Sequence, residues 1–288
     1  MIKLIAADMD GTLIGSNGEI SKKNIKAIKE AQEKGIRFAI ATGRALCDVE
    51  VMLKKYNLKC DTLIMNGAQY LDEDRNEVSS TYIEKNKVKE ILSVMKKYNI
   101  NVEIYTDKGF FTADTEEEVL DGMIKRGKIY RPEIETMEER IAHAKKNLHY
   151  INMQYIDNLD EFIENNNIAK LISFSDSEEL ILDVRKDIEK INGLAVSGSF
   201  STNVEVNHID SEKGKILLKV IDRYNIKREE VAILGDGMND YSMFKEFSCS
   251  FAMDNAVLEI KDAATYITAS NNEDGVAKAI YKIINEKL

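Results

Sequence analysis

The chain has 288 residues, 44% of them hydrophobic, and a formal net charge of −10. This length and hydrophobic content predict one large domain or two of ordinary size and exclude global disorder. The acidic balance argues against nucleic acids and anionic membrane surfaces as partners, and no apolar run is long enough to cross a bilayer.

The cysteines and the N-terminal sequence indicate a cytoplasmic protein. Cys47, Cys60 and Cys249 are far apart and form no Cys-x-x-Cys pair, so we expect free thiols in a reducing compartment. Acidic residues begin at Asp8, so no secretory signal peptide is predicted. Nothing in the sequence indicates an oligomeric state.

The first predicted strand ends in two acidic residues. Residues 4–7 form the continuous apolar run of a buried parallel strand, and Asp8, Asp10 and the turn residue Gly11 follow it. In open α/β sheets, ligands bind outside the carboxyl ends of the strands. Two such carboxylates suit Mg²⁺, which prefers carboxylate, phosphate and water oxygens. An isolated Asp-x-Asp-Gly is more often a β-turn, so the interpretation depends on partner segments elsewhere.

Strands and helices alternate after this strand. The order is typical of βαβ units with right-handed crossovers, which build a parallel sheet. Ser21 is a good helix N-cap and Gly35 a natural helix end. The predicted elements are a helix between these two residues, a strand at 36–41 that ends in Thr42-Gly43-Arg44, a helix at about 45–56 and a strand at 62–65.

The pattern changes in the middle of the chain, where hairpins and helices are mixed. Antiparallel α+β character that interrupts a βαβ chain predicts an inserted domain at 84–190. The core domain would then comprise residues 1–83 and 191–288. The predicted elements of the middle stretch are a helix at about 86–98, a hairpin at 101–112, strands near 149–155 and 170–173, a helix at 177–191, and a hairpin at 194–206 that falls outside the predicted insertion.

The βαβ pattern resumes with a helix from Lys213 to about residue 224, whose apolar face has helical spacing. Strands follow at 231–234, 250–253 and 266–268, and then a C-terminal helix at 275–285. The expected fold class is therefore α/β, a doubly wound and mostly parallel, Rossmann-like sheet with an inserted α+β domain.

Polar residues follow several of these strands or begin the helix after them. A parallel sheet brings such positions to one edge. Acids, one lysine, a hydroxyl and backbone amides are what phosphoryl transfer requires, because its catalysis is mostly positioning and charge neutralisation. The set comprises Asp8, Asp10, Thr42, Gly43, Lys213, Asp236, Asn239 and Asp240.

Four segments resemble the motifs of the haloacid dehalogenase-like hydrolase superfamily, in the same order along the chain. The insertion is similar to the type-two α/β cap of the Cof-type subfamily, whose members include sugar phosphatases. The resemblance covers essentially the whole chain. The four segments are Asp8-Met9-Asp10-Gly11-Thr12, Thr42-Gly43-Arg44, Lys213-Gly214 and Gly235-Asp236-Gly237-Met238-Asn239-Asp240.

The resemblance implies a role for each carboxylate. Asp8 would be the nucleophile that forms an aspartyl phosphate, and Asp10 the general acid and then the general base. Mg²⁺ would be held by the Asp8 carboxylate, the Asp10 backbone carbonyl and Asp236. Asp240 would orient Lys213 or the metal's surroundings.

The resemblance also implies phosphate-binding residues. Thr42, the Gly43 amide and Lys213 would bind the phosphoryl oxygens, and Lys213 would restrain the charge of Asp8. Asn239 would reach the phosphate. Thr42 and Lys213 would therefore join Asp8 and Asp10 as catalytic residues.

Each of these positions has a plainer interpretation. Thr42-Gly43 alone is typical of a strand-to-helix turn, and Lys213 alone of a solvated helix face. Asp240 can be a helix N-cap, and Arg44 a surface residue or a substrate contact. The histidines lack the spacing of metal ligands, and we expect them to be structural or exposed: His143, His149 and His208.

Together these features predict a Mg²⁺-dependent phosphatase that acts on a small phosphorylated metabolite, a sugar phosphate by the resemblance. The insertion would close over the site and exclude water. One alternative is a phosphomutase on the same fold, and another is a non-catalytic sensor of a phosphorylated ligand. The intact Asp8 and Asp10 argue against a sensor, because a pure binding protein needs no nucleophile.

Overall fold

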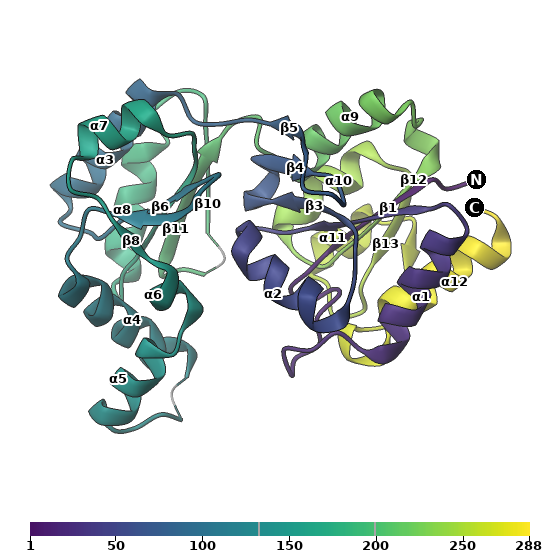
Figure 1. Ribbon diagram of the computed structural model, residues 1–288, viewed down its shortest axis with the longest axis horizontal. Coiled ribbons are helices and arrows are strands. Elements are labelled where there is room, and N and C mark those ends of the chain that lie inside the picture. The colour runs from purple at the N-terminus through teal and green to yellow at the C-terminus, as the bar shows by residue number, and fades with distance from the viewer. Residues whose placement is uncertain (132, 199) are drawn as a thin grey trace. The chain divides into compact units, whose positions relative to one another are not determined.

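The computed structural model describes residues 1–131, 133–198 and 200–288, which form two compact units (Figure 1). The core unit comprises Met1–Ser80 and Asp210–Leu288, and the inserted unit comprises Thr81–Ile209. Each unit contains its own β-sheet. Among the described residues, no helix is long and apolar enough to cross a membrane.

The core unit is built on an eight-stranded sheet of order β14-β13-β12-β1-β2-β3-β4-β5. The strands from β14 to β3 are parallel, while β4 and β5 are antiparallel to their neighbours. The chain runs outward from β1 to one side and later from β12 to the other, so the sheet is doubly wound. The strands are β1 (Leu4–Asp8), β2 (Arg37–Ala41), β3 (Asp61–Ile64), β4 (Gln69–Leu71), β5 (Glu77–Ser80), β12 (Val231–Gly235), β13 (Cys249–Ala252) and β14 (Tyr266–Ile267).

Helices cover both faces of the core sheet. Helices α1 and α12 pack together on one side, and α9 and α10 pack together on the other (Figure 1). Helix α1 begins at Ser21, whose side chain accepts a hydrogen bond from the Asn24 N–H, as expected of an N-cap. The helices are α1 (Lys22–Glu33), α2 (Leu46–Tyr56), α9 (Lys213–Tyr224), α10 (Tyr241–Glu246), α11 (Leu258–Ala263) and α12 (Gly275–Glu286), with short 3₁₀ helices at Met65–Gly67, Arg228–Glu230, Met238–Asp240 and Asn271–Glu273.

The inserted unit contains a six-stranded sheet of order β10-β11-β9-β6-β7-β8. All its pairs are antiparallel except β7 with β8. Helices α3, α7 and α8 cover an apolar face that includes Ile104, Leu171 and Val204. The elements are α3 (Lys85–Lys97), β6 (Glu103–Thr106), β7 (Gly109–Thr112), α4 (Glu116–Tyr130), α5 (Met137–Lys145), α6 (Leu148–Asn152), β8 (Gln154–Tyr155), α7 (Leu159–Asn165), β9 (Ile168–Phe174), α8 (Glu178–Ile188), β10 (Leu194–Ser197) and β11 (Asn203–His208).

The structure confirms the predicted fold class and corrects the predicted end of the insertion. The insertion was expected to end at residue 190, which left the hairpin of β10 and β11 in the core range 191–288. Strand β11 instead pairs with β9, so the inserted unit extends to Ile209. The strand predicted near 149–155 is also wrong over most of its length, because Leu148–Asn152 is a helix.

Candidate active site

Strand pairing brings the predicted site residues to one edge of the core sheet. Asp8 is the last residue of β1, which pairs with β2 on one side and β12 on the other. Thr42 directly follows β2, and Asp236 directly follows β12. The carboxyl ends of these three neighbouring strands therefore present the three residues together.

Lys213 is fully buried at the first position of α9 and joins two acidic residues. Its Nζ lies 2.6 Å from Asp8 Oδ1 and 2.6 Å from Asp240 Oδ1. A buried ammonium with two carboxylate partners is not the solvated helix residue that its lysine-rich surroundings suggest. The side chain instead crosses from α9 to the end of β1.

Asp240 uses both carboxylate oxygens inside the core unit. Oδ1 accepts from Lys213, and Oδ2 accepts from the Asp236 N–H at 3.0 Å and the Gly237 N–H at 3.2 Å. The turn after β12 is thus folded around this carboxylate. Asp240 contacts Lys213, one of the two partners expected for it, and makes no side-chain N-cap bond to α10.

Asp236 is held by the loop that follows β1. The Thr12 hydroxyl donates to Asp236 Oδ1 at 2.7 Å. Gly11 has φ +79°, and a Cβ there would lie 2.3 Å from Asp236 Oδ2, so only glycine allows this close approach. Within the described parts of the chain, Oδ2 of Asp236 and Oδ2 of Asp8 accept no hydrogen bond.

The buried groups near Lys213 carry an excess of negative charge. Burial raises the pKa of Asp8 well above its usual value, Asp240 raises it further, and Lys213 offsets only part of the shift. Burial also raises the pKa of Asp236, to about 6, although its bond from Thr12 opposes the shift. Burial would lower the pKa of Lys213, but Asp240 and Asp8 raise it, so the ammonium stays charged. One ammonium thus faces three carboxylates.

The three carboxylates fit a divalent metal ion. Asp8, Asp236 and Asp240 each offer an oxygen within 4.8 Å of those of the other two. A hard cation with oxygen ligands, such as Mg²⁺, would relieve the charge excess. Asp240 is already occupied by its three donors, so the Oδ2 atoms of Asp8 and Asp236 are the better ligands.

Asp10 lies outside this buried group and pairs with Arg44. The Arg44 guanidinium donates to Asp10 Oδ2 from Nε at 2.8 Å and to Oδ1 from Nη2 at 2.5 Å. The Asp10 side chain is 56% exposed. Arg44 was expected to be a surface residue or a substrate contact. The structure shows a third arrangement, in which Arg44 is a bidentate partner that fixes the orientation of the Asp10 carboxylate.

The predicted phosphate-binding residues lie at the same sheet edge. Thr42 is buried, and its Oγ1 accepts from the Arg44 N–H at 3.2 Å. The Gly43 N–H donates to no other described residue, so it is available to a ligand. Asn239 is exposed in the 3₁₀ helix that ends at Asp240.

Two residues with contacts at the site, Thr12 and Ser242, were not among the predicted site residues. Thr12 could have been found, because it belongs to the first motif and places a hydroxyl beside two acids. Ser242, whose Oγ accepts from the Gly214 N–H at 3.0 Å, carries no such signal.

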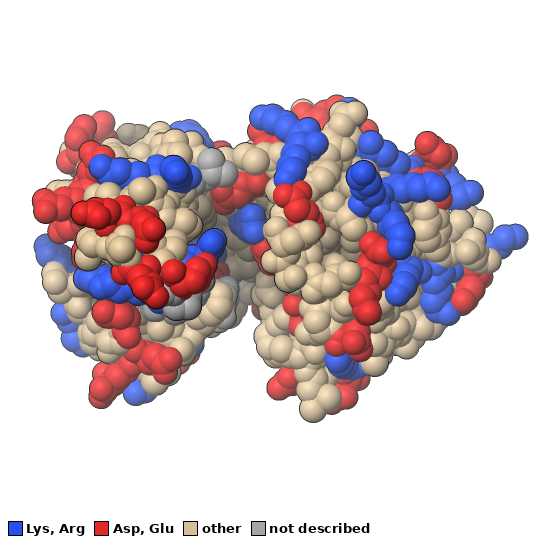
Figure 2. Space-filling view, turned by 90° about the horizontal axis from the view of Figure 1, so that it is seen from below, with Lys and Arg blue, Asp and Glu red and all other residues tan. Residues whose placement is uncertain are grey.

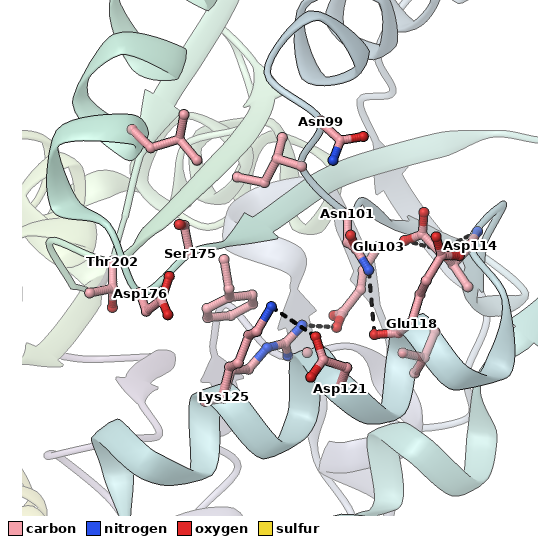
Figure 3. A pocket seen from close by; sticks show the side chains of 17 residues that line it. Asn99, Asn101, Glu103, Asp114, Glu118, Asp121, Lys125, Ser175, Asp176 and Thr202 are labelled. Carbon is pink, nitrogen blue, oxygen red and sulfur yellow. Dashed lines mark hydrogen bonds and ion pairs between the residues drawn. The ribbon is translucent and has the colours of Figure 1, made fainter.

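A cavity of about 250 Å³ in the inserted unit contains none of the predicted site residues (Figure 3). Its basic side chains are paired with its acids, Arg126 with Glu103 and Lys125 with Asp121 at 2.8 Å. On the face in Figure 2, acidic and basic side chains are interspersed over both units. The described core cluster, in which the buried Lys213 joins Asp8 and Asp240 beside Asp236, is the stronger candidate for chemistry because it contains the predicted site residues.

Comparison with known proteins gives a consistent result. Residues 5–280 match the family of haloacid dehalogenase-like hydrolases. The chain is 30% identical over 285 residues to 5-amino-6-(5-phospho-D-ribitylamino)uracil phosphatase YwtE of Bacillus subtilis (strain 168), covering 99% of each chain. It is 31% identical over 281 residues to phosphatase YwpJ of the same organism, covering 96% of this chain and 98% of that protein.

A solved structure of a haloacid dehalogenase-like hydrolase from B. subtilis has the same fold. It superposes with a TM-score of 0.82 at 30% identity and covers 97% of this chain and 99% of its own. The similarity thus extends over both units and confirms the resemblance seen in the sequence motifs.

Proposed function

The chain belongs to the haloacid dehalogenase-like hydrolase family and is a phosphatase, and we propose that it hydrolyses a small phosphorylated metabolite through a phosphorylated Asp8 with Mg²⁺ as cofactor. The observation that carries this proposal is the Asp8 carboxylate. Lys213 holds its Oδ1 at 2.6 Å, while its Oδ2 is left without a hydrogen bond from the described residues. The carboxylate can therefore offer one oxygen to Mg²⁺ and attack phosphorus with the other.

In the first step, an Asp8 oxygen attacks the phosphorus atom and the bond from phosphorus to the leaving oxygen breaks. Asp10 gives a proton to that oxygen, so the product leaves as an alcohol. In the second step, water attacks the phosphorus, Asp10 takes the proton of the water, and the bond to Asp8 breaks. The products are inorganic phosphate and the original carboxylate.

The remaining residues of the set stabilise charge. The Lys213 ammonium restrains Asp8 and, with the Thr42 hydroxyl and the Gly43 N–H, binds the phosphoryl oxygens. Asn239 extends this binding at the exposed side. Asp8, Asp236 and the Asp10 carbonyl would hold Mg²⁺, which when bound screens Asp8 from the anionic substrate and polarises the phosphoryl group.

The proposed substrate is a phosphorylated sugar or sugar alcohol. The insertion resembles the cap of the Cof-type subfamily, whose members include sugar phosphatases, and the relative YwtE is named for a substrate with a 5-phospho-D-ribitylamino group. Sugar phosphates and the 5-phospho-D-ribitylamino group both have a phosphate on a short polyhydroxylated carbon chain. The proposal therefore stays at that class.

The test is hydrolysis of an aryl phosphate with and without Mg²⁺ by the wild type, Asp8→Asn and a matched control, Asp160→Asn. The Asp160 side chain is 88% exposed in the inserted unit, and Asp160 lies far in sequence from the predicted site residues. We expect metal-dependent hydrolysis that Asp8→Asn lowers by about 10⁴-fold or more and Asp160→Asn leaves unchanged.

Metal-independent hydrolysis by the wild type, or full activity of Asp8→Asn, would contradict the proposal. If the aryl phosphate is not hydrolysed, a panel of phosphorylated sugars and sugar alcohols replaces it. Failure on the whole panel would refute the proposed substrate class.

A further inference from the structure

The loop after β1 is closed on itself by backbone hydrogen bonds. The Leu13 N–H donates to the Asp8 carbonyl at 3.2 Å, and the Ile14 N–H donates to the Met9 carbonyl at 2.8 Å. We call residues 9–14 the β1 loop. It contains Asp10, so its position relative to Asp8 decides where the Asp10 carboxylate can act.

Two asparagines far away in the sequence hold this loop from outside. Asn255 Nδ2 donates to the Gly11 carbonyl at 2.8 Å, and Asn271 Nδ2 donates to the Ile14 carbonyl at 2.9 Å. The backbone N–H of Asn271 also donates to Asn255 Oδ1 at 2.9 Å, which joins the Asn271 backbone to the Asn255 side chain. Asn255 and Asn271 form what we call the asparagine clamp.

The first of these contacts lies directly beside Asp10. In the described chain, the Gly11 carbonyl accepts a hydrogen bond only from Asn255. Gly11 has a positive φ, and glycine has the least restricted backbone, so this bond fixes the Gly11–Thr12 peptide plane, directly after Asp10.

The clamp is also connected to the turn after β12. The Val257 N–H donates to the Asp236 carbonyl at 3.0 Å, and the Met253 N–H donates to the Gly235 carbonyl at 3.1 Å. Residues 253–257 thus contact both the loop that carries Asp10 and the turn that carries Asp236. One segment keeps these two parts of the site in register.

We propose that Asn255 and Asn271 are positioning residues that hold the β1 loop so that Asp10 reaches the reacting oxygen. The inference rests on the proposed function, since it assigns a purpose to the position of Asp10. Neither asparagine touches the reacting atoms. Their effect is on the geometry of the loop, and small misplacements of a catalytic group lower rates strongly.

The test compares Asn255→Ala, Asn255→Asp and Asn271→Ala with a matched control, Asn272→Ala. The Asp variant keeps an acceptor for Asn271 but cannot donate to the Gly11 carbonyl. Asn272 accepts from Ser16 N and Oγ at 2.9 and 3.0 Å, outside the β1 loop. Three readouts are measured on the full chain: kcat and KM on the aryl phosphate, hydrogen exchange of the β1 loop without substrate, and Tm.

We expect each Asn255 variant to lower kcat about 10- to 100-fold with KM changed less than about twofold. Exchange in residues 9–14 rises about tenfold, and Asn271→Ala shows the same changes to a smaller degree. Because the lost bonds are exposed or only partly buried, Tm falls by less than about 4 °C. The control changes none of these quantities.

Unchanged exchange in the Asn255 variants would overturn the proposal, and so would increased exchange with unchanged kcat. Faster exchange over the whole core unit, with a large fall in Tm, would show a structural role only and would also overturn it. The exchange readout needs no substrate. A wild type without phosphatase activity would therefore refute the proposed function, while the exchange data would still decide whether the clamp holds the loop.

Discussion

The core unit and the inserted unit each bury charged side chains, but with opposite balance. In the core unit, three carboxylates surround one ammonium. In the inserted unit, each buried acid has its own base. The cluster in the core unit consists of the acids Asp8, Asp236 and Asp240 with the base Lys213. The ion pairs in the inserted unit are Glu103 with Arg126 and Glu205 with Lys170.

The pKa shifts follow this difference. Burial would raise the pKa of Glu103, but Arg126 and then His149 lower it to about 2. Burial instead raises the pKa of Asp236 to about 6, and the bond from Thr12 and the charge of Lys213 do not offset this shift. Burial of charge is therefore no sign of a catalytic site by itself. The cluster with excess negative charge would be stabilised by a bound cation, whereas the charge-balanced ion pairs stabilise a fold.

The difference between the two units can be tested first by removing a basic side chain from the inserted unit. Arg126→Met leaves Glu103 buried without its main partner, and we expect a loss of about 3–5 kcal/mol in the free energy of unfolding. Urea denaturation, with hydrogen exchange in β6 and β9, measures the loss. The control is Lys125→Met, whose exposed pair with Asp121 contributes less than about 1 kcal/mol. Equal effects of the two variants would contradict the account.

Acid should weaken the inserted unit for the same reason. The folded-state pKa of Glu103 is lowered from 4.5 to about 2, so its contribution is complete above pH 4.5 and is lost as pH falls through about 2. The full loss amounts to about 3 kcal/mol. Urea denaturation between about pH 5 and pH 3 should show stability falling in the wild type and a shallower fall in Glu103→Gln. Parallel curves for the two proteins would be evidence against the pairing.

Magnesium should stabilise the core unit alone. Binding to the folded state at 100 times Kd adds about 2.7 kcal/mol to the free energy of unfolding. We expect this gain in the wild type and in Glu103→Gln, but not in Asp236→Asn. Thermal denaturation with and without Mg²⁺ measures it. A gain that survives in Asp236→Asn would place the metal elsewhere.

The smallest expected effect concerns the exposed pair of Asp10 and Arg44. Arg44→Lys keeps the charge but loses the bidentate contact, so Asp10 is less well oriented and kcat should fall about tenfold. Steady-state kinetics on the aryl phosphate measure the change, with Lys54→Met on α2 as a surface control. An unchanged kcat would mean that the orientation of Asp10 does not depend on Arg44.

The sequence was sufficient for the parallel core, because apolar runs that end in polar residues indicate both the parallel strands and the sheet edge where Asp8 and Asp236 meet. The sequence was insufficient where pairing with a distant strand decides which unit a segment belongs to. The pairing of β11 with β9 extends the inserted unit by a hairpin, and the sequence pattern of a hairpin does not show which sheet it joins. The helix at Leu148–Asn152 is short and has apolar residues without a clear period.

The same limit applies within the site. Asp240 was expected to orient Lys213 or the metal's surroundings, and the sequence did not decide between these two partners. The pairing of Asp10 with Arg44 joins the ends of two different strands, and the contact of Asn255 with Gly11 joins residues 244 positions apart. Side-chain partners of this kind become visible only when the sheet is assembled.

The most direct test of the central claim is to trap the phosphorylated carboxylate. Borohydride added during turnover with Mg²⁺ reduces an aspartyl phosphate to homoserine, which mass spectrometry of peptides locates. We predict homoserine at Asp8 only, and none in Asp8→Asn or without substrate. Homoserine at Asp10, Asp236 or Asp240, or turnover with Asp8 unmodified, would contradict the claim that the unbalanced core cluster makes Asp8 the nucleophile.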